Sequence, residues 1–150
     1  MGTLLPERVV FAAVLEATLH RAVASAKNRN HEYATLEHLL LALADDADAS
    51  AVMRACNADV DSIKRSLADH LDNEPNALKS CEAMPTAGFQ RVIQRSVIHV
   101  QASGRQSVDG AQIFVAIFSE LESRAARILA EHKMTREEAV KVIRGRDAAT

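Results

Sequence analysis

The feature that most constrains the fold of this chain is an internal repeat with a period of about 74 residues. Residues 19–23 (LHRAV) align with residues 93–97 (IQRSV), and residues 39–43 (LLLAL) align with residues 113–117 (IFVAI). From Asp59 onward the correspondence continues after a slip of about two residues. A tandem duplication explains this pattern, so both halves of the chain should fold into the same unit.

Each unit has the pattern of four helices. In the first unit, apolar residues recur at helical spacing in a segment that begins at Pro6. Thr35 is a natural N-cap for a short, strongly apolar second segment, and Asp59 caps the last of two further segments. The chain is 48% hydrophobic and only 3% aromatic, with few Gly and Pro residues, which favours helices over strands. We predict an all-α protein of eight helices, built from two four-helix units.

A polar stretch in the middle of the chain separates the two units. It contains Asn73, Pro75 and Pro85 and shows little apolar periodicity, which is typical of an exposed connector. We assign repeat one to residues 8–72, the connector to residues 73–85 and repeat two to residues 86–145. The central segment of each unit is apolar nearly all round and must be covered by its neighbours. We therefore expect a single domain over residues 1–150.

Charge and hydropathy exclude several function classes. Eighteen basic residues oppose twenty acidic ones, and the two signs are interspersed, so no basic surface for nucleic acid is predicted. No apolar segment is long enough to span a bilayer, and the first residues lack the features of a signal peptide. We expect a cytoplasmic protein that binds neither nucleic acid nor membranes. Because coiled-coil heptads are absent, we also expect a monomer.

The segment from His31 to His38 contains the residues most suggestive of chemistry. Zinc hydrolases place two histidines four residues apart on one helical face, with a glutamate between them, in the motif His-Glu-x-x-His. Here His31, Glu32 and His38 supply the residue types, but the histidines are seven residues apart and the Thr35 cap puts a turn between them. A metal-dependent hydrolase at these residues is an alternative that we do not favour. We predict no cofactor.

The two repeats differ at charged positions while their apolar helices agree. Where the first unit has His31, Glu32 and Glu37, the second has Arg105, Gln106 and Ala111. The fold alone therefore does not require the acidic pair. Glu37 has a structural interpretation, because an acid in the first turn of a helix contributes about 0.3 to 1 kcal/mol through the helix dipole. Glu32 has no such role, and we predict that it is exposed.

Three stretches resemble one known family. They are HEYATLEHLLLAL (residues 31–43), FQRVIQRSVIHVQASGR (residues 89–105) and GAQIFVAIFSELES (residues 110–123). They are similar to the N-terminal domain of the Clp (Hsp100) unfoldases, in particular those of the ClpA type, and the resemblance covers most of the chain. It implies an eight-helix, pseudo-twofold domain that is attached flexibly to an ATPase ring and does no chemistry itself. The ring unfolds proteins and feeds them to the ClpP peptidase. Walker motifs are absent here, so we predict no enzyme activity for this chain.

The resemblance also implies which residues bind partners. Glu32, Glu37 and Thr86 correspond to a surface that docks the ClpS adaptor, which delivers substrates bearing destabilising N-terminal residues. Arg95 and Arg136 correspond to a groove for peptides or for the extended arm of the adaptor. We expect a module that docks an adaptor and substrates. Direct capture of unfolded polypeptide without an adaptor is the alternative.

Two further expectations concern the same region. In ClpA-like domains metal is associated with positions matching His31 and Asp72, but aspartate replaces a glutamate here, so we assign no metal site. We also expect that reversing the charges of Glu32 and Glu37 together weakens adaptor binding without unfolding the domain.

Overall fold

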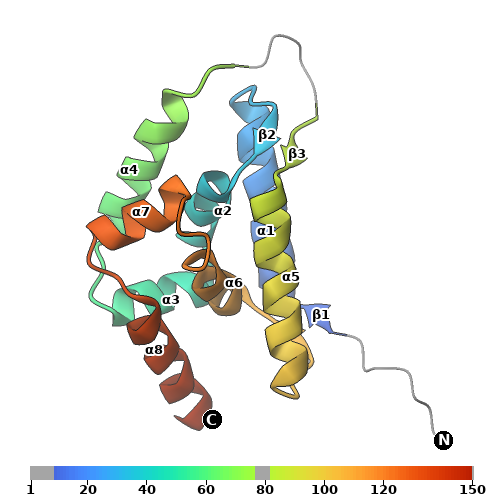
Figure 1. The fold of residues 1–150 in the computed structure, drawn as a ribbon, viewed down its shortest axis with the longest axis vertical. Coiled ribbons are helices and arrows are strands. Elements are labelled where there is room, and N and C mark those ends of the chain that lie inside the picture. The colour runs from blue at the N-terminus through green and yellow to red at the C-terminus, as the bar shows by residue number, and fades with distance from the viewer. Residues whose placement is uncertain (1–8, 77–81, 150) are drawn as a thin grey trace, which may run out of the picture.

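The computed structural model describes residues 9–76 and 82–149. Its helices are α1 (Ala13–Asn28), α2 (Leu36–Leu43), α3 (Ala47–Ala55), α4 (Val60–Asp72), α5 (Ala87–Ala102), α6 (Gly110–Ile117), α7 (Arg124–Glu131) and α8 (Arg136–Ala149). Four two-residue strands lie between them: β1 (Val10–Phe11), β2 (Tyr33–Ala34), β3 (Met84–Pro85) and β4 (Ser107–Val108) (Figure 1). The prediction of an all-α protein with eight helices is confirmed. None of the described helices is long and apolar enough to cross a membrane.

The start of the first repeat differs from the prediction. The apolar spacing that begins at Pro6 predicts a helix that includes Val10, but Val10 lies in β1 and α1 begins at Ala13. Pro6 lies outside the described residues. The N–H of Val10 donates to the carbonyl of Gln106, and the N–H of Ala12 donates to that of Val108, both at 2.8 Å. Pairing with the second repeat therefore replaces helical hydrogen bonds. At the other end, α8 continues past residue 145 to Ala149.

The sequence repeat governs the order and spacing of the elements. The starts of α1 and α5, of β2 and β4, and of α2 and α6 are each 74 residues apart. The starts of α3 and α7 are 77 residues apart, and those of α4 and α8 are 76 apart. The first shift lies between the second and third helices of each unit, where residues 118–123 form a longer connection than residues 44–46. The predicted tandem repeat and its slip are both present.

The strands join the two repeats to each other. β1 pairs in parallel with β4, and β2 pairs in parallel with β3. In each pair one strand precedes the first helix of its repeat, and the other follows the first helix of the opposite repeat. The two pairs are thus equivalent under the pseudo-twofold relation.

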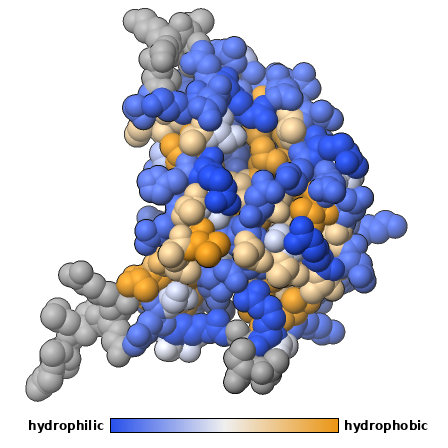
Figure 2. All heavy atoms as spheres, turned by 180° about the vertical axis from the view of Figure 1, so that it is seen from behind, coloured by the Kyte–Doolittle hydropathy of each residue, from blue (hydrophilic) through white to orange (hydrophobic). Residues whose placement is uncertain are grey.

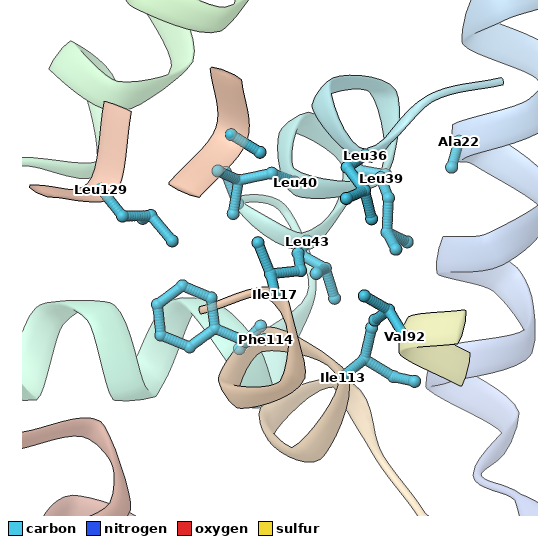
Figure 3. Packing of buried hydrophobic residues seen from close by; sticks show 14 of the residues in the cluster. Ala22, Leu36, Leu39, Leu40, Leu43, Val92, Ile113, Phe114, Ile117 and Leu129 are labelled. Atoms are coloured by element: carbon cyan, nitrogen blue, oxygen red, sulfur yellow. The ribbon is translucent and has the colours of Figure 1, made fainter. Parts of the chain in front are cut away.

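The apolar helices α2 and α6 lie at the centre of the molecule (Figures 1 and 3). Their fully buried side chains include Leu39, Leu40 and Leu43 from α2 and Ile113, Phe114 and Ile117 from α6. The third helix of the opposite repeat covers each of them, since α2 contacts α7 and α6 contacts α3. Each such side chain contributes about 1.5 to 3 kcal/mol by burial. The two repeats share one hydrophobic core.

A buried carboxylate fixes the start of α3 against the core. Asp46 is completely buried, and its Oδ1 accepts hydrogen bonds from the N–H groups of Asp48 and Ala49, both at 2.9 Å. Its Oδ2 accepts the hydroxyl of Thr18 on α1 at 2.6 Å. The first residue of α6 is Gly110, and a Cβ at this position would overlap the Asp46 carboxylate. The glycine therefore allows α6 to approach α3 closely.

We predict that Gly110→Ala lowers the free energy of unfolding by about 1 to 3 kcal/mol, because the added methyl group must displace the Asp46 carboxylate. Gly145→Ala is the matched control. Nothing lies within 4 Å of a Cβ at Gly145 in α8, so this change should stabilise the helix by about 0.5 to 1 kcal/mol. Urea unfolding followed by circular dichroism measures both. Equal effects of the two changes would contradict the close approach of α6 to α3.

Candidate functional site

The β2–β3 pair brings two predicted adaptor-binding residues together. The N–H of Met84 donates to the carbonyl of Glu32 at 3.1 Å, and the N–H of Thr86 donates to that of Ala34 at 3.0 Å. Glu32 is exposed, as predicted. Thr86 is the N-cap of α5, and its hydroxyl oxygen accepts the N–H of Phe89 at 3.2 Å. The hydroxyl of Thr86 therefore has a structural role, while the Glu32 carboxylate faces solvent.

Two exposed apolar side chains on this strand pair were missed by the sequence analysis. Tyr33 and Met84 are register partners, and they are 50% and 59% exposed. Aromatic and methionine side chains are enriched in the centres of protein interfaces. We call the surface formed by Glu32, Tyr33, Met84 and Thr86 the β2–β3 face. Strands of two residues are too short to show periodicity, and only the pairing places Met84 beside Tyr33.

Exposure of apolar residues alone does not single out this face. Val10, Ile98 and Leu121 are also exposed, and Figure 2 shows hydrophobic surface between hydrophilic residues over the rear of the molecule. Isolated apolar residues on a protein surface are normal. The β2–β3 face differs because its apolar pair lies next to an acidic residue and an acidic cavity.

This acidic cavity has a volume of about 280 Å³ and opens beside β2. Glu32 and Tyr33 line it from the β2–β3 face, and Glu37, His70 and Glu74 line it from α2, α4 and the end of α4. Nε2 of His70 lies 3.4 Å from Oε1 of Glu74. Three carboxylates around one cavity favour a basic or hydrogen-bond-donating group of a partner.

Glu37 lies behind the β2–β3 face rather than on it. Its side chain is only 11% exposed, and its Oε2 accepts the N–H of Ala125 at 2.9 Å. Ala125 is in the first turn of α7, where the Ser123 hydroxyl accepts only the N–H of Ala126. Glu37 therefore completes the cap of a helix in the other repeat, in addition to lying in the first turn of its own helix.

This position of Glu37 corrects the expectation for the double charge reversal. A lysine at Glu37 would leave the buried N–H of Ala125 without its acceptor and place a cation at the positive end of α7. Reversal at Glu37 should therefore destabilise the domain, whereas reversal at the exposed Glu32 should not. Adaptor binding by Glu32, Glu37 and Thr86 stays a prediction.

Two buried histidines shape the loop before α2. The N–H of Thr35 donates to Nδ1 of His38 at 2.9 Å, so the His38 proton is on Nε2, which lies 2.9 Å from Nδ1 of His31. Burial, with a smaller contribution from His31, lowers the pKa of His38 to about 4. His38 is neutral at pH 7 and forms a capping box with Thr35. In repeat two the equivalent residue is Gln112, whose Oε1 accepts the N–H of Asp109 at 2.7 Å.

The histidines and the metal candidate Asp72 are engaged in other bonds. Both nitrogens of His38 and Nδ1 of His31 are used in hydrogen bonds, and Asp72 is exposed and paired with Arg29. Within residues 9–76 and 82–149, no three His, Cys, Asp or Glu side chains are arranged to hold a metal ion. Exposed Glu32 lies outside the buried pair. The donors thus fit neither the metal candidates His31 and Asp72 nor a hydrolase centred on His31, Glu32 and His38.

A second cavity brings Arg95 and Arg136 together. It has a volume of about 420 Å³ and is lined by α5, α6 and α8; α6 contacts both α5 and α8 and lies between them in Figure 1. Arg105 and Arg144, which the sequence analysis did not select, also line it. We call this cavity the arginine groove. Its residues come from three helices and two loops of one repeat, so their proximity depends on tertiary packing.

Comparison with known proteins yields a family and a close relative. The sequence profile of the Clp repeat (R) N-terminal domain matches residues 11–132. A ClpA homolog protein from Fuscovulum blasticum is 53% identical over 137 residues, which are 89% of this chain and 17% of that protein. The chain therefore spans about a sixth of the length of this relative.

Solved structures share the fold. The Hsp104 N-terminal domain from Candida albicans has a TM-score of 0.74 and 16% sequence identity, covering 89% of this chain and 87% of that one. A complex of a ClpV N-domain with a VipB peptide has a TM-score of 0.66 and 19% identity, covering 83% and 79%. At these identities the similarity establishes the arrangement of the helices.

We predict that Glu37→Ala lowers the free energy of unfolding by about 1 to 3 kcal/mol, because the buried N–H of Ala125 loses its acceptor. Glu37→Gln keeps an oxygen at the same position and should cost less than about 1 kcal/mol. Urea unfolding of the two variants measures the difference. If Glu37→Ala unfolds like the parent protein, the bond between α2 and α7 contributes nothing to stability.

We predict that the low pKa of His38 makes the domain less stable in acid. Between its folded pKa of about 4 and its ordinary value of 6.5, His38 binds fewer protons in the folded state than in the unfolded state. The free energy of unfolding is therefore unaffected by the titration of His38 above pH 6.5. It falls as the pH is lowered toward 4, by at most about 2 to 3 kcal/mol.

His38→Gln isolates this effect, because Gln112 already forms the equivalent capping box in repeat two. The variant should stay folded at pH 7 and lose less stability than the parent protein between pH 7 and pH 4. Urea unfolding at a series of pH values compares the two. Parallel stability curves would mean that His38 does not titrate as described.

Proposed function

This chain belongs to the Clp N-terminal domain family, and on that premise we propose that it docks the ClpS adaptor through the β2–β3 face, as part of a ClpA-type unfoldase. Domains of this family bind adaptors and substrates and are not catalytic. Within the proposal, the complete protein is an ATP-dependent unfoldase that works with the ClpP peptidase in the cytoplasm. The chain acts in it as a cofactor-free monomer that helps deliver substrates with destabilising N-terminal residues or unfolded substrates.

The observation that carries the proposal is the combination of charge and apolar surface on the β2–β3 face. Exposed Glu32 lies beside the exposed pair Tyr33 and Met84, and Thr86 ends the same strand pair. A central apolar contact surrounded by polar groups is the arrangement from which protein interfaces obtain most of their affinity. In such an interface the carboxylate contributes mainly to orientation and to the association rate.

The acidic cavity next to the face supports a partner with a basic or donating group. Glu32 belongs to both the face and the cavity, and buried Glu37 and exposed Glu74 also line the cavity. A lysine, arginine or amide of the adaptor that enters here would meet carboxylate oxygens on more than one side. Glu37 would then contribute to binding through the charge of the cavity, while its other oxygen holds α7.

Direct capture of polypeptide is a second candidate function, favoured by the arginine groove. Arg95 and Arg136 line one cavity that has room for several side chains. One solved structure that shares the fold is a complex of a ClpV N-domain with a VipB peptide. The groove is separate from the β2–β3 face, so both functions are compatible in one domain.

We predict that Glu32→Lys weakens binding of purified ClpS by at least about tenfold, and that Met84→Ala weakens it by about five- to thirtyfold. Isothermal titration calorimetry measures both affinities. Val10→Ala is the matched control, since Val10 is 55% exposed and occupies the position of Met84 in the pseudo-equivalent β1–β4 pair. The control should bind normally. Normal binding by Glu32→Lys and Met84→Ala, with both variants folded, would reject the β2–β3 face as the docking site.

A further inference from the structure

We propose that the arginine groove binds an acidic segment of polypeptide in which carboxylates alternate with apolar side chains. This inference rests on the second candidate function, the capture of polypeptide, and specifies the chemistry of the bound chain. It does not depend on the ClpS adaptor or on the β2–β3 face.

Three helices each present one stripe of side chains to the groove. The α5 stripe contains Arg95, Ser96 and His99 and is continued by the C-cap residue Ser103. The α6 stripe contains Gln112, Val115 and Ala116 and is continued by Ser119 just beyond the helix, and the α8 stripe contains Arg136, Val140, Ile143 and Arg144. These spacings of three and four residues keep each stripe on one helical face. The other side of α8 is occupied by the core, where Ala139 is completely buried. α8 therefore has two faces in use: one packs in the core, and the other, the α8 stripe, lines the groove.

The groove carries an excess of positive charge. Four arginines line it, and none of its lining residues within the described chain is acidic. Arg136 and Arg144 have no carboxylate partner among the described residues. Nη1 of Arg95 lies 3.4 Å from Oε2 of Glu120, but both oxygens of Glu120 are already bound by Arg91, at 2.7 and 3.2 Å. A cluster of this kind on a chain of net charge −2 attracts carboxylates specifically to this place.

The apolar floor of the groove favours a peptide over a nucleic acid. Val115, Ala116, Val140 and Ile143 are only partly buried and line the cavity between the arginines. Aliphatic side chains of a peptide would be desolvated against them, at about 25 cal/mol for each Å² buried. No Phe, Tyr or Trp is among the described lining residues, so the groove lacks the large aromatic side chains on which unpaired bases usually stack. Bidentate arginine contacts suit the carboxylates of Asp and Glu side chains.

The repeat comparison shows that the fold does not require these arginines. The residues of α4 that correspond to Arg136 and Arg144 are Val60 and Ala68, at the 76-residue offset of the two helices. Val60 is buried in the core, whereas Arg136 is exposed. The corresponding helix of repeat one, α4, therefore folds without either cation. The arginine groove is a local property of repeat two, just as the acidic cavity is a local property of repeat one.

Fluorescence anisotropy with the full chain tests the proposal. The probe is a short fluorescein-labelled peptide that alternates glutamate and leucine, and the comparison peptide has lysine in place of glutamate. We expect the acidic peptide to bind at least about tenfold more tightly than the lysine peptide, and less tightly as the ionic strength rises. The double variant Arg136→Glu with Arg144→Glu should lose at least about tenfold in affinity for the acidic peptide.

The matched control is Arg127→Glu, an exposed arginine on α7 that does not line the groove. It should bind the acidic peptide normally. Circular dichroism confirms that each variant is folded, and Arg136→Ala with Arg144→Ala replaces the double reversal if the latter unfolds. Glu32→Lys should also bind the acidic peptide normally. Loss of adaptor binding with retention of peptide binding in that variant separates the two proposals.

Several results would overturn the inference. One is equal binding of the glutamate and lysine peptides, and another is unchanged binding in both double variants. A polyglutamate peptide without leucine that binds as tightly as the probe would remove the role of the apolar floor. Displacement of the probe by single-stranded DNA at equal concentration would identify a general polyanion site instead of a peptide site.

Discussion

The structure depends on the mutual burial of two apolar helices. α2 and α6 are apolar nearly all round, and neither is covered by its own repeat alone, because α7 covers α2 and α3 covers α6. A single repeat would leave part of this surface in water. The duplication therefore supplies the missing cover for each unit, and the strand pairs β1–β4 and β2–β3 hold the two units in register.

Buried polar groups then determine how the helix ends meet across the repeats. Asp46 caps α3 beside Gly110, and Glu37 completes the cap of α7. His38 and Gln112 close equivalent capping boxes with different chemistry, so one of them titrates and the other does not. The two repeats thus keep the same backbone contacts while their polar residues have diverged.

This divergence places opposite charges on one fold. Repeat one has the acidic cavity beside the β2–β3 face, and repeat two has the arginine groove. A domain with two cavities of opposite charge can hold two different protein segments without competition between them. This property suits a domain that receives an adaptor and a substrate, and it needs no change in the arrangement of the helices.

Hydrophobic periodicity and capping residues act over a few neighbouring positions, so they were sufficient to predict the eight helices, their apolar faces and the tandem repeat, apart from the start of the first helix. The sequence also predicted that Glu32 is exposed. Three features depend on long-range packing: Val10 pairs as a strand with Ser107, Glu37 accepts a hydrogen bond from α7, and Tyr33 lies beside Met84. These contacts join residues that are far apart in the chain. Each contact is stabilising only when tertiary packing brings the second residue into place. No local pattern encodes the identity of that partner.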